Sequence, residues 1–122
     1  ALWRSFGARV VEMDPQEHDT LFALISHLPH LLAFSTMGLS LNKSVDLSLV
    51  GSGFLDSTRL AQCPPSLWVD IAIANSDALA LTLEAFIGEL QDLEVNLRAK
   101  DAESLAFKFH RAHQLRISME AS

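Results

Sequence analysis

The most constraining feature of the sequence is the stretch from Ser66 to Arg98, which contains no proline and only one glycine, Gly88. Such a stretch predicts a single unbroken helix. At about 1.5 Å per residue the helix would be on the order of 50 Å long, which exceeds the width of a small domain. We therefore expect it to overhang its own domain or to pack on another subunit.

Apolar residues on this predicted helix recur at alternating intervals of four and three positions. The set is Leu79, Leu83, Phe86, Leu90, Leu93 and Leu97. A narrow apolar seam of this kind is typical of paired helices. It leaves two partners open: the last predicted helix, at about residues 102–117, in an intramolecular hairpin, or the same helix of a second subunit.

Another helix is predicted to begin at residues 14–17 (DPQE), which supply an N-cap, a proline at the first helical position and a glutamate three residues after the cap. Apolar residues cover more than half of its circumference as far as about Leu41, so it should be buried on most sides. Pro29 lies inside it and cannot donate a helical hydrogen bond, which predicts a kink or a loosened turn beside His27 and His30.

Two shorter features complete the predicted fold. Residues 10–13 form a short β-type run, and the glycines of segment 51–53 form a corner before a short helix, which Asp56 would cap and which would carry Arg59 in its first turn. The fold class is therefore all-α: a helical bundle with one very long helix, preceded by a short strand remnant.

Several polar side chains share one sector of the first long helix. At about 100° per residue, Asp19, Ser26 and His30 fall within about 40° of one another, with His27 roughly 60° to one side and His18 away from the group. This grouping beside a loosened turn indicates a site. The alternative is that these residues serve as caps or as hydrogen-bonding core residues.

Two histidine pairs have the spacing of metal ligands, His27 with His30 and His110 with His113. No third ligand accompanies either pair, and zinc sites usually need three or four protein ligands, so no metal site is predicted. His110 and His113 are expected to be surface residues near a helix C-terminus.

Arg59 is the cation best placed to bind a ligand, because a guanidinium near a glycine corner can bind a carboxylate with two hydrogen bonds. Asp56 lies three residues earlier, so an ordinary Asp–Arg helix pair is the alternative, and spacing alone does not separate the two. Trp68 could wall a pocket, although a tryptophan at a helix start is more often core. The lone Cys63 is expected to pack rather than react, and it fits a reducing cytosol.

Composition narrows the function further. The 122 residues carry a net charge of −6 without a basic patch, which disfavours nucleic acid as a partner. No uninterrupted apolar run reaches the about 18 residues of a membrane span, so a cytoplasmic chain is expected. The apolar fraction of 49% predicts that some apolar surface faces a partner. No phosphate loop, CxxC or Ser/His/Asp order is present.

Several segments together resemble the helical domain of prephenate and arogenate dehydrogenases. They are 7–8 (GA), 13–19 (MDPQEHD), 26–30 (SHLPH), 53–61 (GFLDSTRLA), 65–71 (PSLWVDI) and Asn75. Their order and spacing agree with that family over about residues 7–98. One departure is Ser52, where close relatives often have glycine.

The resemblance implies a domain of a larger enzyme. In that family an N-terminal Rossmann domain holds NAD or NADP, while the helical domain dimerises and completes the substrate pocket. The reaction, in tyrosine biosynthesis, is the oxidative decarboxylation of prephenate to 4-hydroxyphenylpyruvate, with a catalytic histidine in the nucleotide-binding domain. Residues 1–12 would then be the end of that domain and residues 13–122 the helical domain, with no catalytic residue in this chain, which alone should be inactive.

The resemblance also assigns residues. It implies that Arg59 binds a substrate carboxylate, that His30 lies in the substrate pocket and that Asp56 helps to hold or gate the arginine. It further implies a pocket-lining role for Trp68, a place near the pocket entrance for His18 and a supporting role for His27.

Three alternatives remain open from the sequence. The chain could belong to an arogenate dehydrogenase, which would share the fold and the cofactor. It could be a helical interaction module without catalysis, or a metal-binding helical domain.

Overall fold

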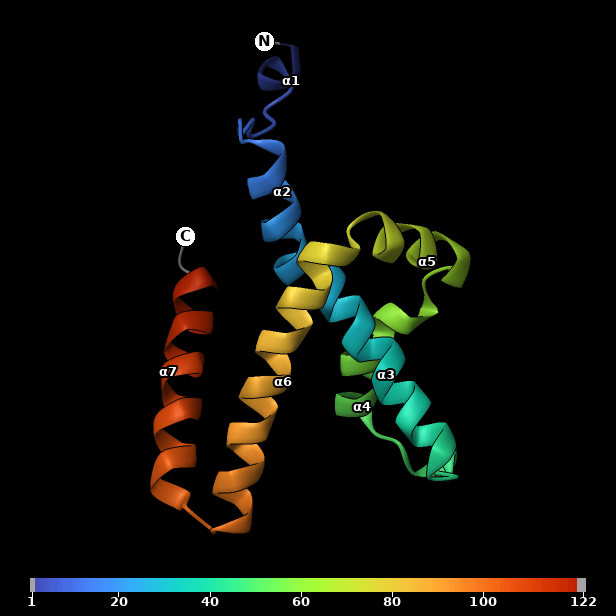
Figure 1. Cartoon of the computed structure of the whole chain (residues 1–122), viewed down its shortest axis with the longest axis vertical. Helices are drawn as coiled ribbons and strands as arrows, with labels where there is room; N and C mark the ends of the chain where they lie inside the picture. The colour runs from blue at the N-terminus through green and yellow to red at the C-terminus, as the bar shows by residue number, and fades with distance from the viewer. Residues whose placement is uncertain (1, 121–122) are drawn as a thin grey trace. The chain divides into compact units, whose positions relative to one another are not determined.

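The structure is a computed structural model that describes residues 2–120 and is built from helices. Figure 1 shows their order along the chain. The elements are α1 (Leu2–Ser5), α2 (Pro15–Phe22), the π-helical η1 (Ala23–His27), α3 (Leu28–Asn42), the 3₁₀ turn η2 (Leu47–Leu49), α4 (Ser52–Thr58), the 3₁₀ turn η3 (Arg59–Gln62), α5 (Pro65–Ala74), α6 (Ser76–Arg98) and α7 (Ala102–Glu120). The part of the chain described contains no strand, which confirms the all-α prediction.

The β-type run at residues 10–13 forms no strand within residues 2–120, so the predicted strand remnant is wrong for this structure. A strand is held by backbone hydrogen bonds to a neighbouring strand, and the described residues supply no such neighbour. Residues 8–14 are instead an irregular link between α1 and α2, and Val11 in this link is 57% exposed.

The chain divides into two compact units, Ala1–Leu83 and Glu84–Ser122. Unit 1 contains α1 to α5 and the beginning of α6. Unit 2 contains the rest of α6 and α7.

The start of α2 is held by a reciprocal pair of cap hydrogen bonds. The Asp14 carboxylate accepts the Glu17 backbone N–H at 3.3 Å, and the Glu17 carboxylate accepts the Asp14 N–H at 3.4 Å. Pro15 occupies the first helical position, where its missing N–H costs no hydrogen bond. The predicted helix start is confirmed.

The loosened turn predicted beside Pro29 is confirmed, and it is a π-helical turn. The Leu28 N–H donates to the Ala23 carbonyl, five residues back, before regular α geometry resumes in α3. Pro29 has no N–H with which to close an ordinary α turn, so the wider turn before it is tolerated. The turn ends at His27, next to the two histidines singled out from the sequence.

The short helix α4 begins earlier than the sequence predicted. Gly51, in an extended conformation, is its N-cap, and Asp56 lies inside the helix instead of capping it. Arg59 consequently does not lie in a first helical turn; it begins the 3₁₀ turn η3. The prediction failed because a backbone carbonyl, that of Gly51, accepts the Leu55 N–H and starts the helix without a side-chain cap.

The unbroken helix predicted over Ser66–Arg98 is also wrong. The chain bends by 95° between α5 and α6, with Asn75 at the break. The Asn75 side chain donates to the Asp19 carbonyl, which ties the bend to α2. A tertiary hydrogen bond therefore overrides the helical propensity of the segment.

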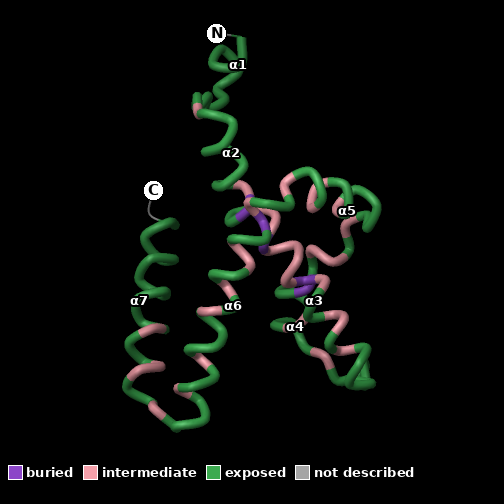
Figure 2. The backbone as a smooth tube through the Cα atoms, viewed as in Figure 1, coloured by how far each residue is buried: buried purple, intermediate pink, exposed green. Residues whose placement is uncertain are grey.

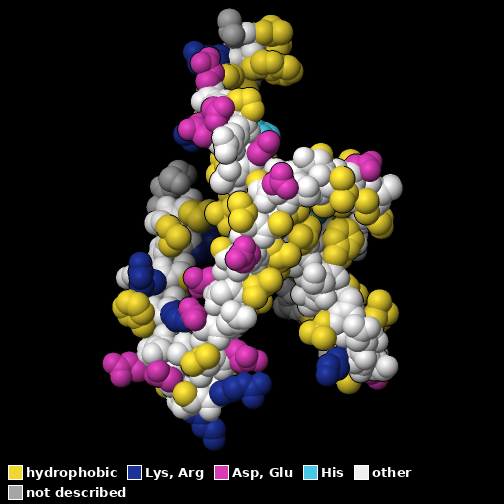
Figure 3. All heavy atoms as spheres, in the orientation of Figure 1, with side chains coloured by type: hydrophobic (Ala, Val, Ile, Leu, Met, Phe, Trp, Pro, Cys, Tyr) yellow, Lys and Arg dark blue, Asp and Glu magenta, His cyan; other side chains and the backbone are white. Residues whose placement is uncertain are grey.

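The core of unit 1 is small. Only Ala23, Leu28, Ala33 and Leu79 are buried apolar residues among those described, and Figure 2 shows the buried segments confined to two places on the trace. The first long helix is not buried on most sides as predicted, since Leu24 and Ile25 are each 56% exposed. Figure 3 shows apolar side chains gathered over α5 and the start of α6.

Some helices of the chain are long and apolar enough to be compared with membrane spans. By length and composition alone, Pro15–Asn42 could cross a membrane, since an 18-residue window of it has a mean hydropathy of 1.3, with 17% of that window buried. Together, α5 and α6 pass the same test as a bent pair. A core helix of a soluble protein and a signal sequence pass the same test, so such helices are weak evidence for a membrane. They do indicate that unit 1 has apolar faces that a partner surface would cover.

In unit 2 the end of α6 and α7 run antiparallel as a hairpin (Figure 1). Lys100, with a φ of 53°, lies in the turn, and the Asp101 carboxylate then accepts the Ser104 N–H at 3.0 Å and its hydroxyl at 2.7 Å. These hydrogen bonds lower the pKa of Asp101. Asp92 on α6 lies 4.0 Å from the Lys108 ammonium on α7.

The hairpin makes α7 the neighbour of the second half of α6, and Asp92 and Lys108 approach each other across it. A contact between α7 and the leucine seam remains a prediction. Two residues of the seam are open to solvent, since Leu90 is 48% and Leu97 62% exposed. The second possible partner, the same helix of another subunit, remains a prediction.

Candidate functional site

Two histidines of the first long helix meet one tryptophan of α5. The His30 ring stacks on Trp68 with ring centroids 3.4 Å apart and an angle of 14° between the planes. The His27 ring meets the same indole edge-on, at 6.0 Å and 74°. We call His27, His30 and Trp68 the histidine cluster. Its members were singled out separately in the sequence, and the structure brings them together.

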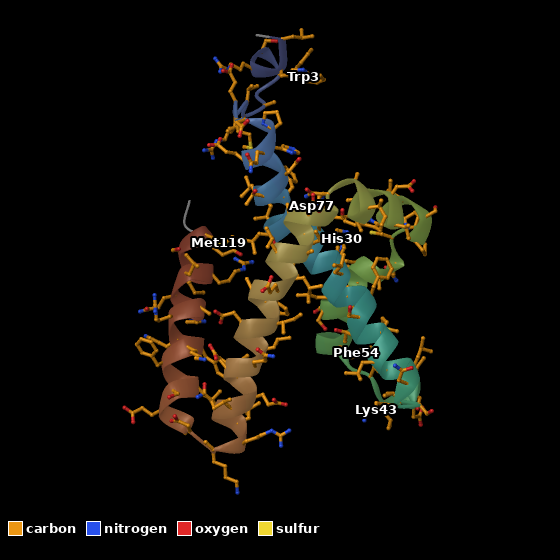
Figure 4. All side chains as sticks on the ribbon, in the orientation of Figure 1. Trp3, His30, Lys43, Phe54, Asp77 and Met119 are labelled. Atoms are coloured by element: carbon orange, nitrogen blue, oxygen red, sulfur yellow. The ribbon has the colours of Figure 1, made fainter. Side chains whose placement is uncertain are left out.

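His30 is held by hydrogen bonds on both ring nitrogens. Nδ1 lies 2.8 Å from the Ser26 carbonyl oxygen, one turn back on the same helix. Nε2 lies 3.7 Å from the Cys63 thiol, which follows η3. Figure 4 labels His30 on α3. The ring is therefore fixed by its own helix, by the segment after η3 and by Trp68.

His27 is tied to the bend between α5 and α6. Its Nδ1 lies 3.2 Å from the Asn75 side-chain nitrogen, which also donates to the Asp19 carbonyl at 2.9 Å. Burial lowers the pKa of His27, and the neighbouring His30 and His18 lower it further, against a smaller opposing effect of Asp19. His27 is thus biased toward its neutral form.

Arg59 lines an apolar cavity of about 530 Å³ within unit 1. The cavity walls come from α3, the segment before α4, α4 and η3, and they are Phe34, Met37, Leu47, Val50, Phe54, Leu55, Thr58, Arg59, Ala61 and Gln62. Figure 4 labels Phe54 on α4. Within residues 2–120 Arg59 forms no ion pair, so its guanidinium is available to an anion. An apolar cavity with one guanidinium suits a ligand that has an apolar ring and a carboxylate.

The remaining predicted site residues lie apart from these contacts. Asp56 is exposed on α4 and forms no ion pair with Arg59 in the part of the chain described, so the structure does not show it holding the arginine. His18 stacks on Phe22 at 4.3 Å and lies 3.3 Å from the Asp19 carboxylate. Its side chain is 53% exposed and makes no ring contact with Trp68 in the part of the chain described.

Neither a metal nor a dinucleotide has a recognisable site among residues 2–120. No three His, Cys, Asp or Glu side chains converge there, and His110 and His113 are exposed on α7. Gly51 and Gly53 belong to the cap and first turn of the short helix α4, without the strand and third glycine of a dinucleotide fingerprint. Gly51 and Gly53 therefore do not form a dinucleotide-binding loop.

Sequence reasoning missed two contacts of the histidine cluster. Cys63 was expected to be a packing residue, and Asn75 was noted only as one of the residues that resemble the family. A signal for Asn75 was present, because Asn, Ser and Asp at 75–77 are helix-capping residue types in the middle of a predicted helix. No sequence signal pairs Cys63 with His30, since the two meet only through the packing of η3 on α3.

The chain is an all-α domain with exposed apolar faces and an apolar cavity lined by Arg59. The family model described as prephenate dehydrogenase, dimerization domain, matches residues 14–111 of the chain. The chain therefore belongs to the prephenate dehydrogenase dimerization-domain family, as its sequence motifs indicated.

Individual relatives agree with this family. The chain is 30% identical to a cyclohexadienyl dehydrogenase of Zymomonas mobilis, over 97% of this chain and 42% of the relative. It is 33% identical to a prephenate dehydrogenase of Bacillus subtilis, over 94% of this chain and 32% of the relative.

A solved structure gives the same answer for the fold. The prephenate dehydrogenase of A. aeolicus, in complex with hydroxyphenyl propionate and NAD⁺, matches with a TM-score of 0.89 and 30% identity, over 97% of this chain and 43% of that one. Synechocystis arogenate dehydrogenase shares the fold, with a TM-score of 0.82 at 23% identity. The chain thus spans less than half the length of the relatives it matches.

Proposed function

We propose that this chain is the substrate-binding and dimerisation domain of an NAD(P)-dependent prephenate dehydrogenase that converts prephenate to 4-hydroxyphenylpyruvate in tyrosine biosynthesis. Support comes from the family match over residues 14–111 and from the names of the relatives. The chain spans 32% to 44% of the relatives described above, so the reaction is proposed for the whole protein that contains it.

The observation that carries the proposal is the position of Arg59. Prephenate has two carboxylates and a six-membered ring. The Arg59 guanidinium lies at an apolar cavity of about 530 Å³ and forms no ion pair within the described residues. A bidentate pair with Arg59 would fix one carboxylate, and the apolar walls would contact the ring.

The histidine cluster has a second role in the proposal. His30 would hydrogen-bond a polar group of the substrate through Nε2, in place of its 3.7 Å contact with the Cys63 thiol, and Trp68 would hold the imidazole against rotation. His27 would support this arrangement. Asp56 and His18 are proposed to act at the edge of the pocket, as the family resemblance implies. Within residues 2–120 Asp56 forms no ion pair, so its proposed role rests on the resemblance alone.

The nicotinamide cofactor is proposed to bind mainly outside this chain. NAD or NADP would accept the hydride in the reaction, and a base in the nucleotide-binding domain would take the hydroxyl proton. Residues of this chain would bind and orient the substrate. The NAD⁺ complex of the A. aeolicus relative supports the cofactor class.

Dimerisation is proposed from the uncovered apolar faces. In unit 1, Val69 is 60% and Ile73 71% exposed on α5, which is high for residues so apolar. The family name supports a second copy as the partner that covers such faces. Light scattering of the full-length protein at micromolar concentration should give a dimer, and a monomer would contradict this part of the proposal.

The function is tested by mixing the full-length protein with prephenate and NAD or NADP and following nicotinamide reduction by absorbance. Reduction with prephenate supports the proposal. Reduction with arogenate alone would reassign the protein to arogenate dehydrogenases. No reduction with either substrate would favour a non-catalytic helical module. A cytoplasmic location is also proposed, and cell fractionation tests it.

A further inference from the structure

We infer that Asn75 is a positioning residue whose side-chain amide holds His27 as the Nε2–H tautomer, so that His27 presents an N–H donor while the adjacent His30 presents a lone pair. The assignment of tautomers rests on geometry alone. The purpose of the donor, to bind a carboxylate or hydroxyl oxygen of the substrate, rests on the proposed function.

The orientation of the Asn75 amide is set by a backbone carbonyl. The nitrogen, and not the oxygen, must face the Asp19 carbonyl oxygen at 2.9 Å, because two carbonyl-type oxygens cannot hydrogen-bond to each other. The same NH₂ group lies 3.2 Å from Nδ1 of His27. Nδ1 must then accept a hydrogen bond, so the ring proton of neutral His27 lies on Nε2.

His30 is held in the opposite tautomer. Its Nδ1 lies 2.8 Å from the Ser26 carbonyl oxygen, which can only accept, so this nitrogen carries the proton. Nε2 of neutral His30 is left with a lone pair, which faces the Cys63 thiol at 3.7 Å. The two rings share Trp68 as a contact, yet one offers a donor and the other an acceptor.

The surroundings of His27 favour its neutral state. The titratable groups that act on it are His18, Asp19 and His30, all on the helix that carries it. From the other side it meets the uncharged Asn75 amide and the Trp68 ring. Asp77 of α6 lines a cavity of about 300 Å³ together with Asn75 and Asp19 and is the nearby charge from that element.

A protonated His27 would carry an N–H at Nδ1 that points at the N–H of Asn75. That contact is repulsive, so the amide opposes protonation as well as choosing the tautomer. An aspartate in place of Asn75 would reverse both effects, because a carboxylate accepts a hydrogen bond from Nδ1–H and stabilises the charged ring.

The test is nuclear magnetic resonance of the full-length protein labelled with ¹⁵N-histidine, in which ring nitrogen shifts distinguish the two tautomers. His27→Gln assigns the signals. Asn75→Asp is the test variant, and Asn42→Asp, an exposed asparagine at the end of α3, is the matched control. The Michaelis constant for prephenate is measured on the same proteins.

The unaltered protein should show His27 protonated on Nε2. Asn75→Asp should move that proton to Nδ1, raise the pKa of His27 by about one to three pH units and increase the Michaelis constant about tenfold, with Asn42→Asp unchanged. Protonation on Nδ1 in the unaltered protein would overturn the inference, even if the variant failed to fold. A His27 signal that is the same in all three proteins would overturn it too.

The two proposals fail separately. If the tautomer switches as expected but the protein reduces neither nicotinamide cofactor with prephenate, the inference on Asn75 holds and the proposed function is wrong. If prephenate is oxidised while His27 carries its proton on Nδ1, the proposed function holds and the inference is wrong.

Discussion

His30 and Trp68 lie face to face, with ring centroids 3.4 Å apart and planes 14° from parallel. The stack joins α3 to α5, two elements that are separated in sequence by η2, α4 and η3. It also leaves only the edge of the imidazole for hydrogen bonds. The contact therefore stabilises the packing of unit 1 and also orients His30, which is proposed to bind the substrate.

Removing the indole should separate these two effects. Trp68→Ala is expected to lower the free energy of unfolding by about 1–3 kcal/mol, since the stack and its buried area are both lost. Trp68→Phe should keep most of the stability but raise the Michaelis constant for prephenate several-fold. Urea unfolding and steady-state kinetics measure the two. An unchanged Michaelis constant in both variants would show that Trp68 does not orient His30.

Pro29→Ala should restore a regular α turn before α3. The new N–H can close an ordinary hydrogen bond, and removal of an interior proline should keep or raise stability, by up to about 1 kcal/mol. The same change rotates His27 relative to His30, so substrate binding should weaken about tenfold. Thermal unfolding and the Michaelis constant check this, with Pro65→Ala, at the start of α5, as the control. Tight binding in a stabilised Pro29→Ala protein would contradict the role given to the π turn.

The first long helix shows which structural features could be predicted from the sequence and which could not. Its start at Asp14 and the irregularity beside Pro29 were predictable because a capping box and a proline act within one turn of the chain. The break at Asn75 was not, because it depends on a hydrogen bond to the Asp19 carbonyl, far away in the sequence. Local signals define helix starts, whereas tertiary contacts decide where a long apolar segment bends.

Stability should depend on pH through His27. Its pKa is lowered in the folded protein, so between the folded and unfolded values the unfolded chain binds more protons. The stabilisation is thus fully present above the ordinary histidine pKa of about 6.5 and is lost as the pH falls through the folded value. Unfolding at several pH values should show stability declining below about pH 6.5, and His27→Gln should reduce that slope. An identical pH dependence in the variant would refute this assignment.

The cap of α2 gives a prediction independent of the site. Asp14→Ala removes the acceptor for the Glu17 N–H and should cost about 0.5–2 kcal/mol of stability, without changing the catalytic rate constant. Asp14→Asn should recover most of the loss, because an asparagine oxygen caps equally well. Chemical unfolding measures the effect. Equal stability of the alanine and asparagine variants would show that the cap hydrogen bond is unimportant.

The site was foreseen in its members but not in its contacts. Helical spacing placed His27 and His30 close together. Arg59 and Trp68 were candidates from their place in the sequence, and the family resemblance assigned their roles. The stack on Trp68 and the thiol contact of Cys63 required the path of the chain through η3, for which the sequence offers no local signal. Asp56, expected as a cap, lies within α4, because the Gly51 carbonyl begins that helix.

The central claim, that Arg59 anchors a carboxylate of prephenate, is tested most directly by the Michaelis constant of the full-length enzyme for prephenate with Arg59→Ala. Arg98→Ala, which removes an exposed arginine of α6, is the control. Loss of a charge-assisted hydrogen-bonded pair should cost about 1.5–3 kcal/mol of substrate binding, which raises the Michaelis constant ten- to hundredfold or more. Arg59→Lys should give a Michaelis constant between those of the unaltered enzyme and Arg59→Ala. An Arg59→Ala enzyme with an unchanged Michaelis constant and turnover would contradict the account.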